Sequence, residues 1–395
     1  MYKLIDLFCG CGGISRGFEW TGRFGSQLGV DIEKHPIDAY QKNIKNIDRE
    51  PPVIFHGDIT ELAENPKLLW EKLNEGGVFK KGDIDVLAGG PPCQGFSRNG
   101  VRKYEDEESS IRFYDDPRNH LYKEFLKLIE ETNPKLVLIE NVREFLNYGK
   151  GKFSEDLINK LNELGYEVKY QKVSAANYGV PQKRHRVIFI AANKKYIRNA
   201  ENALHFPLET HKEVKKDKVE LSSLKPWVNV KEAFDGLPKP VYEHNKPVRA
   251  KEGIKSEFGK LVNRDIKSIE NHVARNLSEK SLERIRAVGN GRMKDICDTL
   301  KTKKFYGSAY GRLSWDAPAL TITTWVYHVG SGRFAHPSED RAITMREAAR
   351  LQTFDDGYIF PPLINPTSQM VGNAVPPLLA SKFAEVFAKI LDENV

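Results

Sequence analysis

Cysteine is scarce in this sequence, and its scarcity excludes several classes of protein. Four cysteines, Cys9, Cys11, Cys93 and Cys297, are spread over 395 residues, too few and too scattered for a disulfide framework. Cys9 and Cys11 form a Cys-x-Cys pair, but no second cluster offers the other two ligands that a structural zinc ion needs. We therefore expect reduced thiols and no bound metal.

Long apolar runs are also missing. The sequence has no stretch of about eighteen apolar residues, which argues against a membrane span. The N-terminal MYKLIDLFCG lacks the charged start, apolar stretch and cleavage site of a signal peptide. Internal repeats and low-complexity tracts are absent as well. A cytoplasmic protein is the expectation.

Positive charge is in modest excess. Lysine and arginine number 61 against 54 acidic residues, which gives a formal net charge of +7. The basic residues are dense from about residue 193 to 305, where a polyanion such as nucleic acid would find a complementary surface. On charge alone, a solvated surface is the simpler explanation.

The first 190 residues alternate between short apolar runs and amphipathic stretches. Strands are predicted at KLIDLF, LGVDI, VIF, IDVLA, KLVLIE, EVKYQKV and RVIFIAA, and helices at GISRGFEW, HPIDAYQKNI, TELAENPKLLWEKL, NHLYKEFLKLIEET and FSEDLINKLNEL. This alternation predicts an α/β fold with a doubly wound, mostly parallel sheet. Ligands of such sheets bind beyond the carboxyl ends of the strands.

The character of the chain changes after Asn193. Residues 193–270 are rich in Lys, Glu, Pro and His with little periodicity, which indicates a separate, irregular module. Aromatic and β-branched alternation over 306–334 predicts short strands. Thr344 and Glu347 have the spacing of a capping box at a helix start, and SKFAEVFAKILDENV predicts a final amphipathic helix.

Three successive predicted strand ends carry residues suited to a nucleoside. DLFCGCGG is a glycine-rich turn before a helix, but only Gly10 and Gly12 match GxGxxG, because Ser15 occupies the third position. This disfavours a pyrophosphate cradle, and with it a nicotinamide oxidoreductase. Asp31 suits ribose hydroxyls and Asp58 an adenine amino group, although either acid can instead cap a helix. A nucleoside cofactor such as S-adenosylmethionine is expected.

Cys93 lies in GGPPCQGFS, directly after two prolines and near a predicted strand end. The prolines fix the backbone and present the thiol in a set direction. A nearby cation or helix N-terminus would make it a reactive thiolate, whereas most free cysteines are small buried hydrophobes. The next strand, KLVLIENV, brings Glu140 to the same edge. A carboxyl there can donate a proton, or it can be satisfied by backbone amides.

Basic residues precede the last strand of this region, in VPQKRHRVIF. Arg184 and Arg186 alternate along the chain, so an extended backbone would point both to one face. They could then reach a common carboxylate or phosphate.

The motifs DLFCGCGG, GGPPCQGFS, ENV, QKRHR, REAARLQTF and VGNAVP occur in this order and resemble the motif set of the cytosine-C5 DNA methyltransferases. The resemblance covers the chain apart from about 193–300. It implies a Rossmann-like, S-adenosylmethionine-binding catalytic domain at 1–192 plus 368–395. A smaller, strand-containing target-recognition domain with a hinge would occupy 193–367.

The resemblance also implies a mechanism and its residues. Cys93 would attack C6 of a cytosine flipped out of duplex DNA, and Glu140 would protonate N3. Arg184 would hold the flipped base and Glu140. The implied cofactor pocket consists of Phe8, Gly10, Gly13, Asp31, Ile32, Asp58, Ile59, Pro92, Leu121, Asn373 and Val375. Glu33 is an alternative ribose ligand to Asp31.

Contacts with DNA are expected from several arginines and polar residues. Residues 97–119 resemble the mobile loop that closes over DNA in this family. The expected DNA-contacting residues are Gln94, Ser97, Arg118 and Arg186, together with Arg312 and Arg333, which we expect at base edges.

Two alternatives stay open at this point. A tRNA cytosine-C5 methyltransferase is disfavoured because the Cys-Phe-Thr tripeptide of that branch is absent. A catalytically silent DNA-binding regulator has no need of both Cys93 and Glu140. Because the motifs begin at residue 6, we expect a compact, monomeric modification enzyme of prokaryotic type. Its partners would be double-stranded DNA and a functionally paired restriction endonuclease.

Overall fold

The computed structural model describes residues 1–92, 120–214, 223–242, 246–250, 253–302 and 307–394, which form two units. Unit 1 consists of Met1–Ser174, His185–Leu208 and Ala380–Val395, and unit 2 of Ala175–Arg184 and Glu209–Leu379. These bounds differ from the expected division, because 175–184 and 368–379 belong to unit 2 and 193–208 belong to unit 1. The chain therefore passes between the units four times.

Unit 1 is built around a seven-stranded sheet with the strand order β3-β2-β1-β4-β5-β8-β6. The strands are β1 (Tyr2–Leu7), β2 (Phe24–Asp31), β3 (Val53–His56), β4 (Val86–Gly89), β5 (Leu136–Val142), β6 (Tyr166–Ser174) and β8 (His185–Asn193). β8 runs opposite to the other six strands of this sheet, which are parallel to one another. The predicted mostly parallel α/β sheet is confirmed. The reversed direction of β8 brings its first residues to the edge where the parallel strands end.

Helices follow the strands as the amphipathic patterns predict. They are α1 (Gly13–Trp20), α2 (Lys34–Asn43), α3 (Ile59–Glu64), α4 (Pro66–Glu75), α6 (Leu121–Thr132), α7 (Lys152–Glu163) and α8 (Ala200–Ala203). The single helix expected at TELAENPKLLWEKL is wrong, because the chain breaks at Asn65 into α3 and α4. Pro66 disfavours helical backbone at the residue before it, and the Asn65 side chain caps α4 by accepting from Leu68 N.

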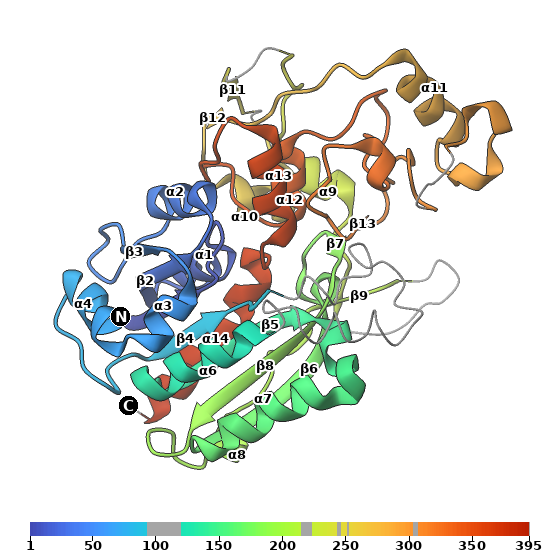
Figure 1. Cartoon of the computed structure of the whole chain (residues 1–395). Coiled ribbons are helices and arrows are strands. Elements are labelled where there is room, and N and C mark those ends of the chain that lie inside the picture. Colours follow the sequence, from blue (N-terminus) through green and yellow to red (C-terminus); the bar gives the residue numbers. More distant parts are fainter. Residues whose placement is uncertain (93–119, 215–222, 243–245, 251–252, 303–306, 395) are drawn as a thin grey trace. The chain divides into compact units, whose positions relative to one another are not determined.

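Both faces of the unit 1 sheet are covered. Buried side chains of α3, α4, α6 and α7, among them Leu73, Phe125 and Leu157, pack with the strands in one core. Helix α14 (Pro377–Asn394) packs Phe387 against Phe18 of α1, with ring centroids 6.1 Å apart. Figure 1 shows α6 and α7 in front of the sheet and α14 behind it. The predicted doubly wound architecture follows from this arrangement.

Unit 2 is mostly irregular. Its strands are two residues long: β7 (Gln182–Lys183), β9 (His211–Lys212), β10 (Lys225–Pro226), β11 (Val248–Arg249), β12 (Ser268–Ile269) and β13 (Ala319–Leu320). Its helices are α9 (Val230–Phe234), α10 (Glu257–Asn263), α11 (Glu279–Val288), α12 (Met345–Leu351) and α13 (Ile364–Asn373). The strands expected over 306–334 are largely wrong, since the described part, 307–334, holds only β13 and one bridge residue, Arg312. Turns interrupt the alternation there, at several glycines.

Helix α12 begins with the predicted capping box. Thr344 Oγ1 accepts from the amide of Glu347, and the Glu347 carboxylate accepts from the amide of Thr344. Arg341 donates to both carboxylate oxygens of Glu347 at 2.8 Å. Burial raises the pKa of Glu347, but the hydrogen bonds and charge of Arg341 outweigh it and lower that pKa to about 2. An ion pair buried inside unit 2, between Arg341 and Glu347, therefore holds the start of α12.

A membrane-spanning helix is not found among the described residues, where every helix is too short or too polar to cross a bilayer.

Candidate active site

The glycine-rich turn after β1 is tightly folded but leaves open space at one glycine. Phe8, Gly10 and Gly12 all have positive φ, at 56°, 54° and 88°, a conformation that glycine adopts at little cost. A Cβ atom on Gly12 would lie 2.8 Å from Ile44 Cγ1, so only glycine fits there. Beside Gly10, by contrast, no described atom lies within 4 Å of such a Cβ. The turn can therefore admit a ligand next to Gly10.

Asp31 joins this turn to the end of β2. Its Oδ2 accepts from Gly10 N at 2.8 Å and its Oδ1 from Glu33 N at 2.9 Å. Burial raises the pKa of Asp31, and these amide donors oppose the rise. Ile32 follows with 60% of its surface exposed, and Glu33 is exposed at the N-cap of α2. The structure thus brings Gly10, Asp31 and Ile32 together at one edge of the sheet.

A buried chain of hydroxyl groups lies behind the turn, and the sequence analysis missed it. Ser15 Oγ donates to Asp6 Oδ2 at 2.5 Å and lies 2.7 Å from the Tyr40 hydroxyl, which lies 2.5 Å from Ser26 Oγ. Burial raises the pKa of Asp6 to about 7. Ser15, which replaces the third glycine of GxGxxG, is therefore a fixed link between α1 and the strands. The signal for this buried network in the sequence was Asp6, an acidic residue inside the apolar run KLIDLF.

Asp58 and its neighbours have structural roles in unit 1. Asp58 Oδ1 accepts from Thr60 N at 2.9 Å and caps α3, with Glu61 completing a capping box. The helix-cap alternative is thus what the structure shows, and adenine binding by Asp58 stays a prediction. Ile59 is 4% exposed, and Leu121 packs against the same core from the start of α6. Gly13, the first residue of α1, is also buried.

Glu140, near the end of β5, is paired with an arginine. Arg186 Nε lies 2.7 Å from Glu140 Oε1, and the two side chains are 16% and 11% exposed. The pair arises from the antiparallel register, in which Val142 lies opposite Arg186 and Glu140 opposite Ile188. The two residues are thus diagonal neighbours on adjacent strands, within reach of long side chains.

The turn after β4 lies next to Glu140. A Cβ atom on Gly90 would be 3.3 Å from Glu140 Oε2, and Asn141 Nδ2 donates to the Pro91 carbonyl at 3.4 Å. Pro92, half-buried, is the last described residue before Cys93. Gly90 and Pro91 therefore lie beside Glu140 and Asn141 at this edge of the sheet. Four predicted site residues lie outside the described residues: Cys93, Gln94, Ser97 and Arg118.

Arg184 does not have the environment that we expected. It is 1% exposed in unit 2, where its guanidinium donates to the carbonyl oxygens of Ile322, Gly372 and Asn373 at 3.3, 3.0 and 3.3 Å. Within unit 1 the Glu140 carboxylate is paired with Arg186, and the contact with Glu140 that we expected of Arg184 stays a prediction. Arg184 and Arg186 have different surroundings because the strand before Arg184, β7, pairs with β13, whereas the strand that contains Arg186, β8, pairs with β5 and β6.

The last two predicted cofactor residues lie at and just after the end of α13 in unit 2. Asn373 ends α13 with an exposed side chain, and Val375 is 7% exposed. Gly372 packs against the backbone of residues 323 and 324 so closely that a Cβ atom would lie 2.4 Å from it. Cofactor binding by Asn373 and Val375 stays a prediction.

The two arginines expected at base edges are held inside unit 2. Arg312 donates to the carbonyls of His336 and Glu339 and pairs with Asp340. Arg333 donates to the carbonyl oxygens of Asn290, Gly291 and Arg312. The structure thus gives both guanidinium groups an internal role, and their contact with DNA bases remains a prediction without structural support.

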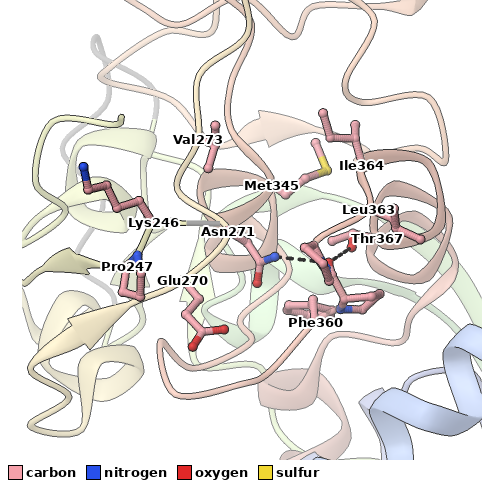
Figure 2. A pocket seen from close by; sticks show the side chains of 12 residues that line it. Lys246, Pro247, Glu270, Asn271, Val273, Met345, Phe360, Leu363, Ile364 and Thr367 are labelled. Carbon is pink, nitrogen blue, oxygen red and sulfur yellow. Dashed lines mark hydrogen bonds between the residues drawn. The ribbon is translucent and has the colours of Figure 1, made fainter. Parts of the chain in front are cut away.

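Unit 2 contains a pocket of about 310 Å³ that none of the predicted site residues lines. Asn271 points into it and donates to the Pro361 carbonyl at 3.2 Å, and Thr367 donates to the same oxygen at 2.8 Å, as Figure 2 shows. Most of the wall is apolar. The lining residues are Lys246, Pro247, Glu270, Asn271, Val273, Met345, Phe360, Pro361, Pro362, Leu363, Ile364 and Thr367.

Known proteins resemble the chain over nearly its whole length. Residues 2–389 match the family described as C-5 cytosine-specific DNA methylase. The chain is 33% identical to the Type II methyltransferase M1.HphI of Haemophilus parahaemolyticus, over 98% of this chain and 86% of that protein. It is 31% identical to the Type II methyltransferase M.AgeI of Thalassovita gelatinovora, over 97% and 98%.

Solved structures agree with this fold. A prophage-encoded E. coli protein described as a DNA modification methyltransferase has a TM-score of 0.72 and 25% identity, covering 99% of this chain and 100% of that one. The S. pombe Dnmt2 methyltransferase has a TM-score of 0.57 over 100% and 99% of the two chains. At 16% identity, the latter likeness concerns the fold alone.

Proposed function

The chain belongs to the C-5 cytosine-specific DNA methylase family and is a DNA cytosine-5-methyltransferase, and we propose that it acts on a flipped cytosine through a covalent adduct with Cys93. One observation carries this proposal. The paired Glu140 and Arg186 lie at the edge of the sheet, beside the turn that begins at Gly90, and Gly90 is three residues before Cys93 in the sequence. An acid held by a cation next to a nucleophile suits attack on a pyrimidine ring.

The proposed steps assign one task to each residue. The Cys93 thiolate forms a bond to C6 of cytosine, while Glu140 donates a proton to N3, and the electron pair of the C5–C6 double bond moves to C5. Arg186 fixes the orientation of the Glu140 carboxyl group. After C5 has gained its methyl group, a solvent water molecule takes the C5 proton, the C5–C6 double bond forms again as the C6–S bond breaks and the thiolate leaves, and Glu140 recovers its proton from N3.

The edge formed by Gly10, Asp31 and Ile32 fits S-adenosylmethionine. Open space beside Gly10 gives room for the amino-acid end, the Asp31 carboxylate suits ribose hydroxyls, and exposed Ile32 offers an apolar surface to the adenine. Asp31 is favoured over Glu33 because its carboxylate already lies at the glycine turn. When bound, S-adenosylmethionine supplies the electrophilic methyl group. We assign no metal to the reaction.

The proposed substrate is a specific sequence in double-stranded DNA. A base inside a duplex is not accessible to a thiolate, so the cytosine must leave the stack. Because unit 2 is irregular and basic, we assign target recognition to it. The names of the relatives as Type II methyltransferases favour a restriction–modification pair. We propose that this chain acts in it as a monomer, functionally paired with an endonuclease. A tRNA substrate is the alternative.

Labelled S-adenosylmethionine tests the proposal directly. The purified protein is incubated with plasmid DNA or with tRNA, and modified cytosines are mapped by bisulfite sequencing. Incorporation at one recurring DNA sequence is expected, with none in a Cys93→Ser variant of unchanged thermal midpoint. Incorporation into tRNA alone would contradict the proposal that DNA is the substrate. Normal activity of the Cys93→Ser variant would contradict the proposed covalent adduct with Cys93.

A further inference from the structure

A group of two aromatic rings, one exposed and one half-buried, lies with a guanidinium on the surface of unit 2. Trp325 is 59% exposed, and its ring stacks on Tyr327 with centroids 5.8 Å apart and an interplanar angle of 30°. The Arg275 guanidinium lies over Tyr327, 5.4 Å from the ring centroid. We call Arg275, Trp325 and Tyr327 the aromatic platform. Tryptophan gains more than most residues from burial, so an exposed and ordered one indicates a binding surface.

The segment that carries the platform is held rigidly. Ser331 Oγ lies 2.7 Å from the carbonyl oxygens of both Trp325 and His328, either of which can accept its one proton. Val326, between the two platform rings, and Val329, two residues after Tyr327, are 0% and 3% exposed and anchor the segment in unit 2. The rings are thus presented on an ordered turn, and binding a ligand there costs little conformational entropy.

The residues just before the aromatic platform form hydrogen bonds with the QKRHR segment and with helix α13. Ile322 N donates to Gln182 Oε1 at 3.1 Å, and the Ile322 carbonyl accepts from Arg184. Ser368 Oγ of α13 donates to the Thr324 carbonyl at 2.8 Å. The residues directly before Trp325 therefore rest on the QKRHR segment and on α13. A ligand on the platform would be positioned relative to both motifs.

From these observations we infer that the aromatic platform stacks an unstacked nucleobase of the substrate duplex, with Arg275 contacting a neighbouring phosphate. The inference rests on the proposed function, since extrusion of a cytosine opens the duplex and leaves base faces without neighbours. Every base has a π-face that an aromatic ring can cover. A guanidinium beside the rings complements the phosphate charge. No role in the chemical step is assigned to these residues.

Substitution of Trp325 tests the inference, once the target sequence has been mapped. We expect Trp325→Ala to weaken cognate duplex binding roughly 10- to 100-fold, the range for losing one stacked base, and Trp325→Phe to restore most of it. Tyr242→Ala is the matched control, because Tyr242 is an aromatic residue of unit 2 with 60% exposure. Thermal midpoints and affinity for S-adenosylhomocysteine should be unchanged in all three variants.

A fluorescent base distinguishes stacking from a merely structural effect. With 2-aminopurine placed at each position of the target in turn, one position should be dimmer in the wild-type complex than in the Trp325→Ala complex. Arg275→Ala should lower the slope of log affinity against log salt by about one. Equal binding by Trp325→Ala and Tyr242→Ala, or no position with a fluorescence difference, would overturn the inference.

Failure of the proposed function has a different signature. In that case the wild-type protein would not methylate cytosine in DNA at all. If the wild type methylates DNA and the Trp325 variants behave like the control, only the aromatic platform is refuted.

Discussion

Nε of Arg186 lies 2.7 Å from Oε1 of Glu140, although the two residues come from strands that run in opposite directions. The reversed strand β8 is what makes this pair possible, because its N-terminal end meets the carboxyl end of β5. A cation is thereby fixed beside an acid at the edge of the sheet where the parallel strands end.

Removal of Arg186 should affect the reaction more than the fold. In Arg186→Ala, the Glu140 carboxyl loses the group that orients it, and the single-turnover methylation rate should fall about 100-fold or more, the scale of positioned acid–base catalysis. Affinity for S-adenosylhomocysteine should be retained. Arg198→Ala, at an exposed arginine of unit 1, serves as control. A rate equal to that of the control would refute the role of Arg186.

Arg184 should show the opposite behaviour. Arg184→Met removes a buried guanidinium that donates to three carbonyl oxygens. Because those acceptors would lose charged partners, we expect unfolding in urea to require ~2–4 kcal/mol less free energy. A variant with native stability and a selective loss of methyl transfer would return Arg184 to the catalytic role that we first assigned to it.

Asp31 and Glu33 can be separated by cofactor affinity. Asp31→Asn removes the negative charge that we assign to the ribose hydroxyls, so calorimetry should show S-adenosylhomocysteine binding weakened roughly 10- to 100-fold. Glu33→Gln, two residues away and exposed, should change the affinity little. The reverse order of effects would make Glu33 the ribose ligand.

Asp6 should make the stability of the protein depend on pH. Its pKa is raised from 3.8 to about 7 by burial, so the folded state binds this proton more tightly than the unfolded chain does. The free energy of unfolding should therefore fall as pH rises through the window between these two values, by at most ~4 kcal/mol, and this contribution should level off above it.

Asp6→Asn is the matched variant for this effect, because an amide keeps an acceptor for Ser15 and carries no ionisable proton. Urea unfolding followed by circular dichroism at pH 5.5 and at pH 8.5 compares the two proteins. We expect the variant to lose less stability than the wild type between these two conditions. Identical losses would show that Asp6 is not the titrating group.

Much of unit 1 was predictable because its signals are local. The apolar runs of a parallel sheet buried on both faces are continuous, so each strand of that sheet was found from its own residues. The capping box of Thr344 and Glu347 needs only four consecutive residues, and it was predicted for the same reason. The motifs that resemble a family were short and dense, and the match over residues 2–389 confirms that resemblance.

The errors arose where the outcome depends on distant partners. Alternation along QKRHR placed Arg184 and Arg186 on one face, but it did not reveal that the backbone leaves one sheet and enters another between them. Arg312 and Arg333 were expected at base edges because they lie in the glycine-rich segment of the recognition module, and the sequence did not reveal that their guanidinium groups donate to carbonyl oxygens of remote turns. The same holds for Ser15, whose partner Tyr40 comes from another helix.

Helix α14 closes unit 1 from the far end of the chain, with Tyr2 donating to Asp392 at 2.6 Å and Phe18 packing on Phe387. During synthesis on the ribosome, strand β1 must wait until residues 377–394 have been made before its sheet is covered on that face. Deletion of residues 380–394 would therefore leave the core of unit 1 exposed on the side of Phe18.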